Sequence, residues 1–222
     1  MNNKISAVLR IHLKDKATLL YLPIIIFLGN LLIGSILNIF RDQPTMKNSI
    51  VTIYVFMFVM GILIIGRTFY YAVGLSTRRR DYMIATMITL ISISAILSLF
   101  FSFISLLENY FSFNLGVMIN EYSDLNNFPI WERFYFNFCV FLHMFLLGML
   151  INCLTRVFGK HLIWMLGLLV LGFANLEPLQ DLAVAFIKTL WELPPAALFN
   201  WSLLLSFVYG WIVYLFLRRL PV

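Results

Sequence analysis

The side chains in this sequence that could perform chemistry are few and widely separated. The three histidines, His12, His143 and His161, lie far apart, and the interiors of the long apolar stretches contain no Asp or Glu. A serine nucleophile needs a histidine base within hydrogen-bond reach, and a catalytic metal needs clustered ligands. Ser76 lies at the edge of an apolar stretch beside arginines. We therefore predict no catalytic residue and no metal site.

Two ionisable side chains fall inside apolar stretches, which makes them candidates for function. His143 lies near the middle of residues 131–154, either as part of a translocation path or as a neutral imidazole hydrogen-bonded to a neighbouring helix. Arg67 lies about two turns before the end of residues 49–75, where it could snorkel to the interface, form an internal pair or contact a substrate. The sequence leaves these roles open.

A row of serines follows in the next apolar stretch. Ser94, Ser98 and Ser102 recur every four residues, which places their side chains on one face of a helix, here called the serine face. Small residues allow helices to approach closely, and hydroxyl groups can hydrogen-bond across a helix pair. The serine face is therefore either a packing seam or a polar translocation surface.

The densest charge lies in residues 74–82, Gly-Leu-Ser-Thr-Arg-Arg-Arg-Asp-Tyr, between two long apolar stretches. Three consecutive arginines are excluded from hydrocarbon, so they must lie in water or among lipid headgroups. Residues 76–82, here called the cationic turn, therefore mark one side of a membrane and are a candidate contact point for a partner outside it.

The composition is that of a membrane protein. Of the 222 residues, 62% are hydrophobic and 12% are charged, which is more apolar surface than a soluble domain of this length could bury. The net charge of +6 does not indicate nucleic-acid binding, because the basic residues are spread over several short loops. We predict an all-α membrane protein with a single transmembrane domain over residues 1–222.

Six stretches approach or exceed the roughly 20 apolar residues that a membrane-spanning helix requires. They are residues 19–40, 49–75, 83–107, 131–154, 157–176 and 200–217. Most Lys and Arg residues fall on one side of these spans, and such a bias marks the cytoplasmic side. We therefore expect a multi-pass protein of the cell membrane with both termini in the cytoplasm.

Two segments outside the spans are predicted to be amphipathic helices. Residues 3–17 mix apolar and basic residues, which suits an interfacial helix in contact with anionic membrane lipids. In residues 178–193, apolar residues recur at helical spacing with polar residues on the other face. Pro194 and Pro195 then end the pattern, so we expect this helix on the extracellular surface between the fifth and sixth spans.

The cationic turn resembles a feature of a known family, the membrane subunits of ABC type-two exporters. In bacterial members, the second and third spans are joined by a short cytoplasmic turn with a small residue, Ser or Thr, two basic residues, an acidic residue and an aromatic one. This form is matched by Gly74, Ser76, Thr77, Arg78, Arg79, Asp81 and Tyr82. The predicted six spans, cytoplasmic termini and two amphipathic helices are also similar to the small six-span members.

The resemblance implies the permease subunit of an ATP-driven exporter of amphipathic peptides or other hydrophobic compounds. The cationic turn would dock on a separate cytosolic ABC ATPase. The residues in this coupling role would be Ser76, Thr77, Arg78, Arg79, Arg80, Asp81 and Tyr82. This chain would need no cofactor of its own, since ATP and Mg would be bound by the partner. A second permease subunit, identical or similar, would complete the transporter.

The chain carries no phosphate-binding loop that would contradict this division of labour. The nearest match, Gly159-Lys160, is followed by His161 instead of Ser or Thr. The main alternative is a standalone membrane sensor or immunity protein, which would need no ATPase. An intramembrane enzyme is the less favoured alternative.

Overall fold

The computed structural model describes residues 3–14, 17–39, 49–111, 129–159, 161–175, 181, 185, 188 and 194–219. The regular structure of these residues is helical, which confirms the predicted all-α class. The elements in chain order are α1 (Asn3–Lys14), the π-helical turn η1 (Ala17–Tyr21), α2 (Leu22–Ile39), α3 (Ser49–Ile64), the π-helical turn η2 (Ile65–Phe69), α4 (Tyr70–Gly74), α5 (Arg79–Phe111), α6 (Ile130–Phe158), α7 (His161–Asn175) and α9 (Pro195–Arg219).

Four helices in the described part of the chain are long and apolar enough to cross a membrane. They are Ile50–Gly74, formed by α3, η2 and α4, then Arg79–Leu107 in α5, Ile130–Phe158 in α6 and Ala197–Arg218 in α9. They correspond to the second, third, fourth and sixth predicted spans. The first and fifth predicted spans coincide with α2 and α7. These two helices are not among the four that meet the length and hydropathy of a span, so a total of six spans stays a prediction.

Two helix boundaries differ from the prediction for local reasons. α5 begins at Arg79, whereas the predicted span begins at Met83. The prediction follows apolar residues, and the first turn of α5 is polar. α6 continues to Phe158, beyond the predicted end at Leu154, and ends at Gly159, which has a φ of 73°. Glycine takes a positive φ without the steric cost that a side chain would bring.

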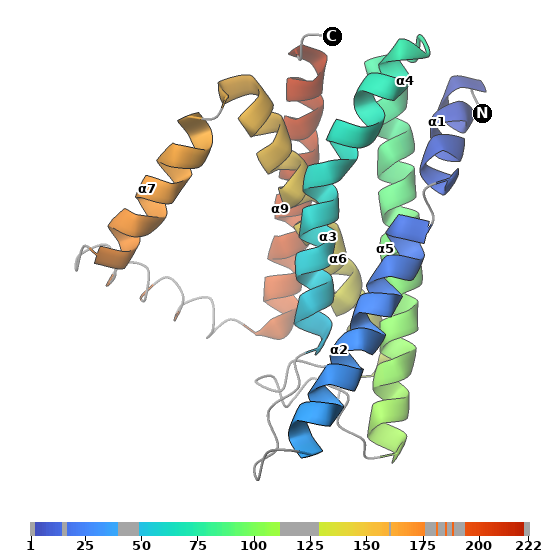
Figure 1. The fold of residues 1–222 in the computed structure, drawn as a ribbon, viewed down its shortest axis with the longest axis vertical. Coiled ribbons are helices and arrows are strands. Elements are labelled where there is room, and N and C mark those ends of the chain that lie inside the picture. Colours follow the sequence, from blue (N-terminus) through green and yellow to red (C-terminus); the bar gives the residue numbers. More distant parts are fainter. Residues whose placement is uncertain are drawn as a thin grey trace.

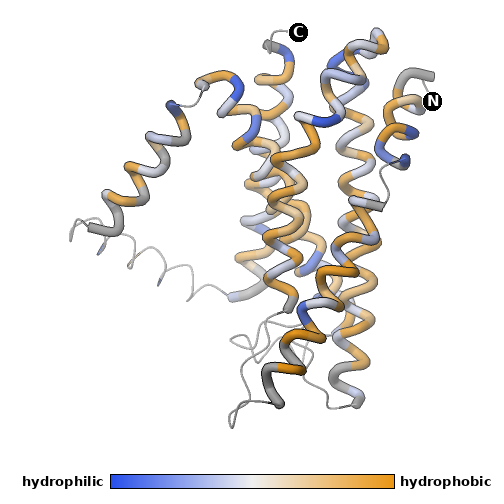
Figure 2. The backbone as a smooth tube through the Cα atoms, in the orientation of Figure 1, coloured by the Kyte–Doolittle hydropathy of each residue, from blue (hydrophilic) through white to orange (hydrophobic). Residues whose placement is uncertain are grey.

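α6 forms the centre of the bundle, because it packs against α3, α5 and α9. Figure 1 shows these helices side by side, while α7 is set away from the others. Aromatic side chains fill the interior: the Phe101 ring of α5 lies 5.0 Å from Phe27 of α2 and 5.9 Å from Phe141 of α6, between ring centroids. Hydrophobic residues dominate the length of the bundle helices (Figure 2).

Helices α3 and α6 approach one another closely at Gly61 and Gly148. A Cβ atom added at Gly61 would overlap the carbonyl oxygen of Phe145, and one at Gly148 would overlap that of Phe58. The backbones therefore touch directly, which only a residue without a side chain permits.

One end of the molecule gathers several segments that are distant in sequence. α1, the turn between α4 and α5, and the C-terminal end of α9 lie together at the top of Figure 1. The sequence predicts these segments to share a side of the membrane, and their assignment to the cytoplasm stays a prediction.

The two predicted amphipathic helices differ in how much the structure describes. Residues 178–193 lie outside the described residues, apart from Asp181, Ala185 and Lys188, which are exposed. α1 covers most of residues 3–17 and packs against α5, where its Val8 and His12 side chains are buried.

Candidate functional site

The cationic turn begins with a tight helix ending in which Ser76 has an unusual backbone conformation. Ser76 N–H donates to the carbonyl of Val73 at 2.9 Å, and Thr77 N–H donates to that of Ala72 at 3.2 Å. These two bonds form a Schellman motif, whose left-handed position usually holds glycine. Ser76 occupies that position with a φ of 57°. The chain therefore reverses direction within a few residues, and the arginines follow at once.

The three arginines of the turn are not equivalent. Arg78 and Arg80 are exposed, whereas Arg79 is half-buried and donates from one guanidinium nitrogen to the carbonyls of Leu217 at 3.1 Å and Arg218 at 2.6 Å. Those carbonyls belong to the last turn of α9, where helices leave acceptors unpaired. Arg79 therefore fastens the turn to α9, and the other two arginines stay exposed.

The acidic and aromatic residues of the turn point inward. Asp81 is 9% exposed and lies in the first turn of α5, where a negative charge complements the helix dipole. Tyr82 is fully buried, and its hydroxyl lies 2.8 Å from that of Thr68 in η2. Its ring makes an edge contact with Phe69 at 5.3 Å between centroids. Tyr82 therefore joins the start of α5 to the end of the preceding span.

The N-terminal helix is attached to the same region by a buried polar contact. His12 Nε2 of α1 lies 3.2 Å from the hydroxyl of Thr86, one turn after Tyr82. The cationic turn therefore contacts η2 and α9, and the next turn of α5 contacts α1.

Arg67 is exposed within η2, a π-helical turn inside the helix Ile50–Gly74, which is the second predicted span. α6 supports the same stretch, since Asn152 donates to the carbonyl of Ile62 at 2.7 Å. Arg156 donates to Asn152 at 2.7 Å and to the Tyr70 hydroxyl at 2.9 Å. Such π-helical turns are frequent at functional sites, but nothing here assigns Arg67 a substrate contact.

The serine face is buried in the protein interior. Ser94, Ser98 and Ser102 are fully buried, and Ser98 donates to the carbonyl of Phe134 in α6. The hydroxyls of Ser94 and Ser102 have no hydrogen-bond partner among the described residues. Of the two interpretations, this geometry favours a seam that packs α5 against α6.

Sequence reasoning missed Ser105 and Arg133, which continue this seam. Ser105 is fully buried and accepts a hydrogen bond of 2.9 Å from Arg133, which is only 3% exposed. A separate polar contact joins α3 to α6, where Asn137 accepts from the Tyr54 hydroxyl at 2.8 Å. Ser105 follows Ser102 by three residues on the same helix face, and this spacing was the available signal.

His143 contacts α9. Its Nδ1 lies 3.2 Å from the carbonyl of Ser202 and 3.5 Å from the hydroxyl of Ser206. A carbonyl only accepts, so Nδ1 carries the proton, while Ser206 donates its own proton to the same carbonyl at 2.7 Å. His143 therefore cannot activate Ser206 through Nδ1, and the pair lacks the geometry of a nucleophile and its base. Among the described residues, no group of three or more His, Cys, Asp or Glu could hold a metal ion.

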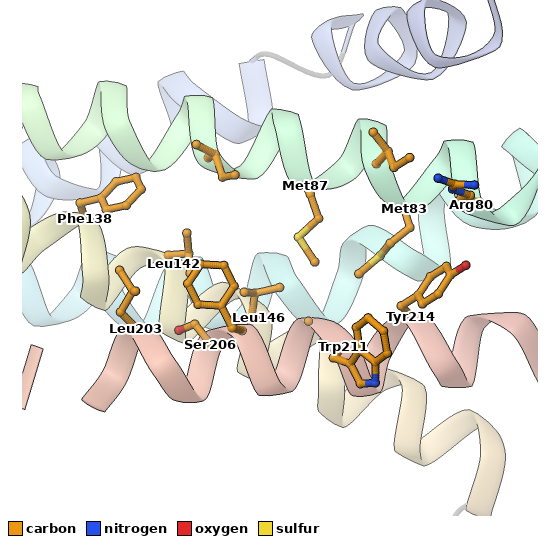
Figure 3. A pocket seen from close by; sticks show the side chains of 14 residues that line it. Arg80, Met83, Met87, Phe138, Leu142, Leu146, Leu203, Ser206, Trp211 and Tyr214 are labelled. Carbon is orange, nitrogen blue, oxygen red and sulfur yellow. The ribbon is translucent and has the colours of Figure 1, made fainter. Parts of the chain in front are cut away.

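An apolar groove of about 680 Å³ opens between α5, α6 and α9. Figure 3 shows Arg80, Trp211 and Tyr214 toward one end and Phe138 and Leu203 toward the other. Its walls also include side chains from all three helices: Met83, Met87, Ile91, Leu142, Leu146 and Ser206. The groove therefore begins at the cationic turn and extends into the apolar part of the bundle.

The four long apolar helices indicate a protein of the multi-pass helical membrane class. Comparisons with models of known protein families, with curated proteins and with solved structures find no match.

Proposed function

We propose that this chain is the permease subunit of an ATP-driven exporter of the ABC type-two kind, moved by a separate cytosolic ATPase. The observation that carries the proposal is the construction of the cationic turn. Arg78 and Arg80 are exposed, where a partner could bind them, while Arg79 and Tyr82 fasten the turn to the membrane helices. A surface of this kind suits the transmission of force better than a loop attached only by its ends.

The connections of the turn suggest how movement of a motor would reach the membrane. A shift of Arg79 would act on α9 through its carbonyl bonds, and a shift of Tyr82 would act on η2 through Thr68. α9 borders the groove, so the route through Arg79 leads to its wall, whereas the route through Tyr82 leads to the preceding span. The partner would bind ATP and Mg, and a second permease subunit would provide the other half of the path.

The rest of the proposal follows the expected topology. It includes six spans, both termini in the cytoplasm, an interfacial N-terminal helix and an extracellular amphipathic helix over residues 178–193. The cargo would be an amphipathic peptide or another hydrophobic compound, which suits an apolar groove with polar residues at one end.

The test is co-purification of the full chain with a soluble ATPase in mild detergent, followed by measurement of substrate-stimulated ATP hydrolysis. The double variant Arg78→Ala, Arg80→Ala should lose the ATPase or uncouple it, because both side chains are exposed and neither holds the bundle together. Arg10→Ala is the matched control, since it removes an exposed arginine from α1.

Unchanged coupling in the double variant would refute the role of the turn. If no ATPase accompanies the wild-type chain, the standalone sensor or immunity protein becomes the better hypothesis. An enzymatic activity that His143→Ala abolishes, with assembly intact, would revive the intramembrane enzyme.

A further inference from the structure

The groove between α5, α6 and α9 has the length of one membrane leaflet. Along α5 it extends from Arg80 to Ile91, and along α9 from Leu203 to Tyr214. Both pairs are separated by eleven positions, which corresponds to about 17 Å of helix at a rise of 1.5 Å per residue. One leaflet of the hydrocarbon core is about 15 Å deep, half of the total thickness.

The groove changes from polar to apolar along this length, as a membrane leaflet does from its headgroups to its acyl chains. Arg80 lies at one end with Tyr214 and Trp211, which are residue types of the headgroup interface (Figure 3). The remaining walls are almost entirely aliphatic or aromatic. Ser206 is the exception, and its hydroxyl is bonded to the carbonyl of Ser202. The interior of the groove therefore suits a chain without polar atoms.

Two exposed cations lie at or near the polar end. Arg80 is exposed, and Arg218 is also exposed, with its guanidinium 5.9 Å from the centroid of the Tyr214 ring. None of the described residues that line the groove is acidic. The groove thus combines an apolar channel of leaflet length with cations where a headgroup would lie.

We propose that this groove binds one acyl chain of an anionic phospholipid, with the headgroup phosphate against Arg80. The lipid comes from the leaflet at the end of the molecule that carries the cationic turn. The inference concerns the same groove that the proposed function gives to the cargo, but its test needs neither an ATPase nor a cargo, so the two proposals can fail separately.

The experiment measures lipid binding to the purified, delipidated full chain by native mass spectrometry. The probes are phosphatidylglycerol and phosphatidylcholine with identical acyl chains, which differ in headgroup charge. The wild-type chain should bind phosphatidylglycerol about fivefold more tightly, the effect expected of one basic residue at an anionic headgroup. Arg80→Gln should abolish this preference, so that the two lipids bind equally tightly. Arg78→Gln is the matched control, an exposed arginine two residues away and outside the groove, and should keep it.

A second pair of variants tests the apolar part. Gly210→Leu places a side chain in the groove, where even a Cβ would lie 3.2 Å from the terminal carbon of Met87, and should weaken binding of both lipids. Gly29→Leu is the control, since its added Cβ meets no atom within 4 Å beyond the neighbouring backbone of its own helix. Equal binding of the two lipids by the wild-type chain would overturn the proposal, as would an equal loss of preference in Arg78→Gln. If Gly210→Leu dissociates a dimer and leaves lipid binding unchanged, a second copy of the chain occupies the groove and the proposal is wrong.

Discussion

The contact between Gly61 and Gly148 makes the stability of the bundle sensitive to a single methyl group. The two Cα atoms face one another across α3 and α6, and a Cβ on either residue would lie 3.1 Å from the other glycine's Cα. It would also overlap a carbonyl oxygen of the facing helix. These neighbours are backbone atoms, so no side chain can rotate to make room, and the helices themselves must move.

The expected cost follows from that movement. A separation of about 1 Å forfeits a quarter to a half of the dispersion energy of each affected contact. Small-to-large substitutions in packed interiors cost about 1–3 kcal/mol, whereas alanine is favoured over glycine in a helix by about 1 kcal/mol. We therefore compare Gly148→Ala with Gly29→Ala. Gly29 is a helical glycine whose added Cβ meets no atom within 4 Å beyond the neighbouring backbone of its own helix, so the helix preference cancels. We expect Gly148→Ala to be about 2 kcal/mol less stable than Gly29→Ala.

The assay is reversible unfolding of the full chain from mild detergent into SDS, followed by circular dichroism. Gly61→Ala should show a loss similar to that of Gly148→Ala. The double variant should cost less than the sum, because helices already moved apart by one methyl group can accommodate a second nearby. If both single variants unfold within about 0.5 kcal/mol of Gly29→Ala, the smallest coupling that such comparisons resolve, then the close contact is not a determinant of stability.

Two further predictions use the same unfolding assay. Ser76→Gly should raise the free energy of unfolding by about 0.5–1 kcal/mol, because glycine removes the strain of a left-handed side chain at a small cost in unfolded-state entropy. A loss of stability would show that the Ser76 side chain matters more than its backbone conformation. Ser105→Ala should lower the free energy of unfolding by about 1 kcal/mol, because Arg133 loses a hydrogen-bond acceptor. Ser102→Ala should cause no loss, since its buried hydroxyl has no partner among the described residues, and equal losses in the two serine variants would contradict the packing-seam interpretation.

Much of the secondary structure could be predicted from the sequence, because it depends on local patterns. Long apolar stretches form helices in which every backbone polar group is satisfied internally, and three arginines in a row must interrupt them. The spacing of Ser94, Ser98 and Ser102 likewise predicts a shared face, because a helix brings every fourth residue to the same side. Boundaries were less predictable: α5 begins before its apolar stretch, at Arg79, since a helix can start in the polar interface.

The sequence established that the chain is helical and apolar enough for a membrane, and that the cationic turn must lie outside the hydrocarbon, because hydropathy and charge act over a few consecutive residues. Only the tertiary structure could distinguish Arg79, which bonds to α9, from Arg78 and Arg80, which are exposed. The same holds for the groove, whose walls come from three helices, and for the Gly61–Gly148 contact. These features depend on which helix faces are brought together over long separations in the chain, and neighbouring arginines or scattered glycines look alike until that packing is known.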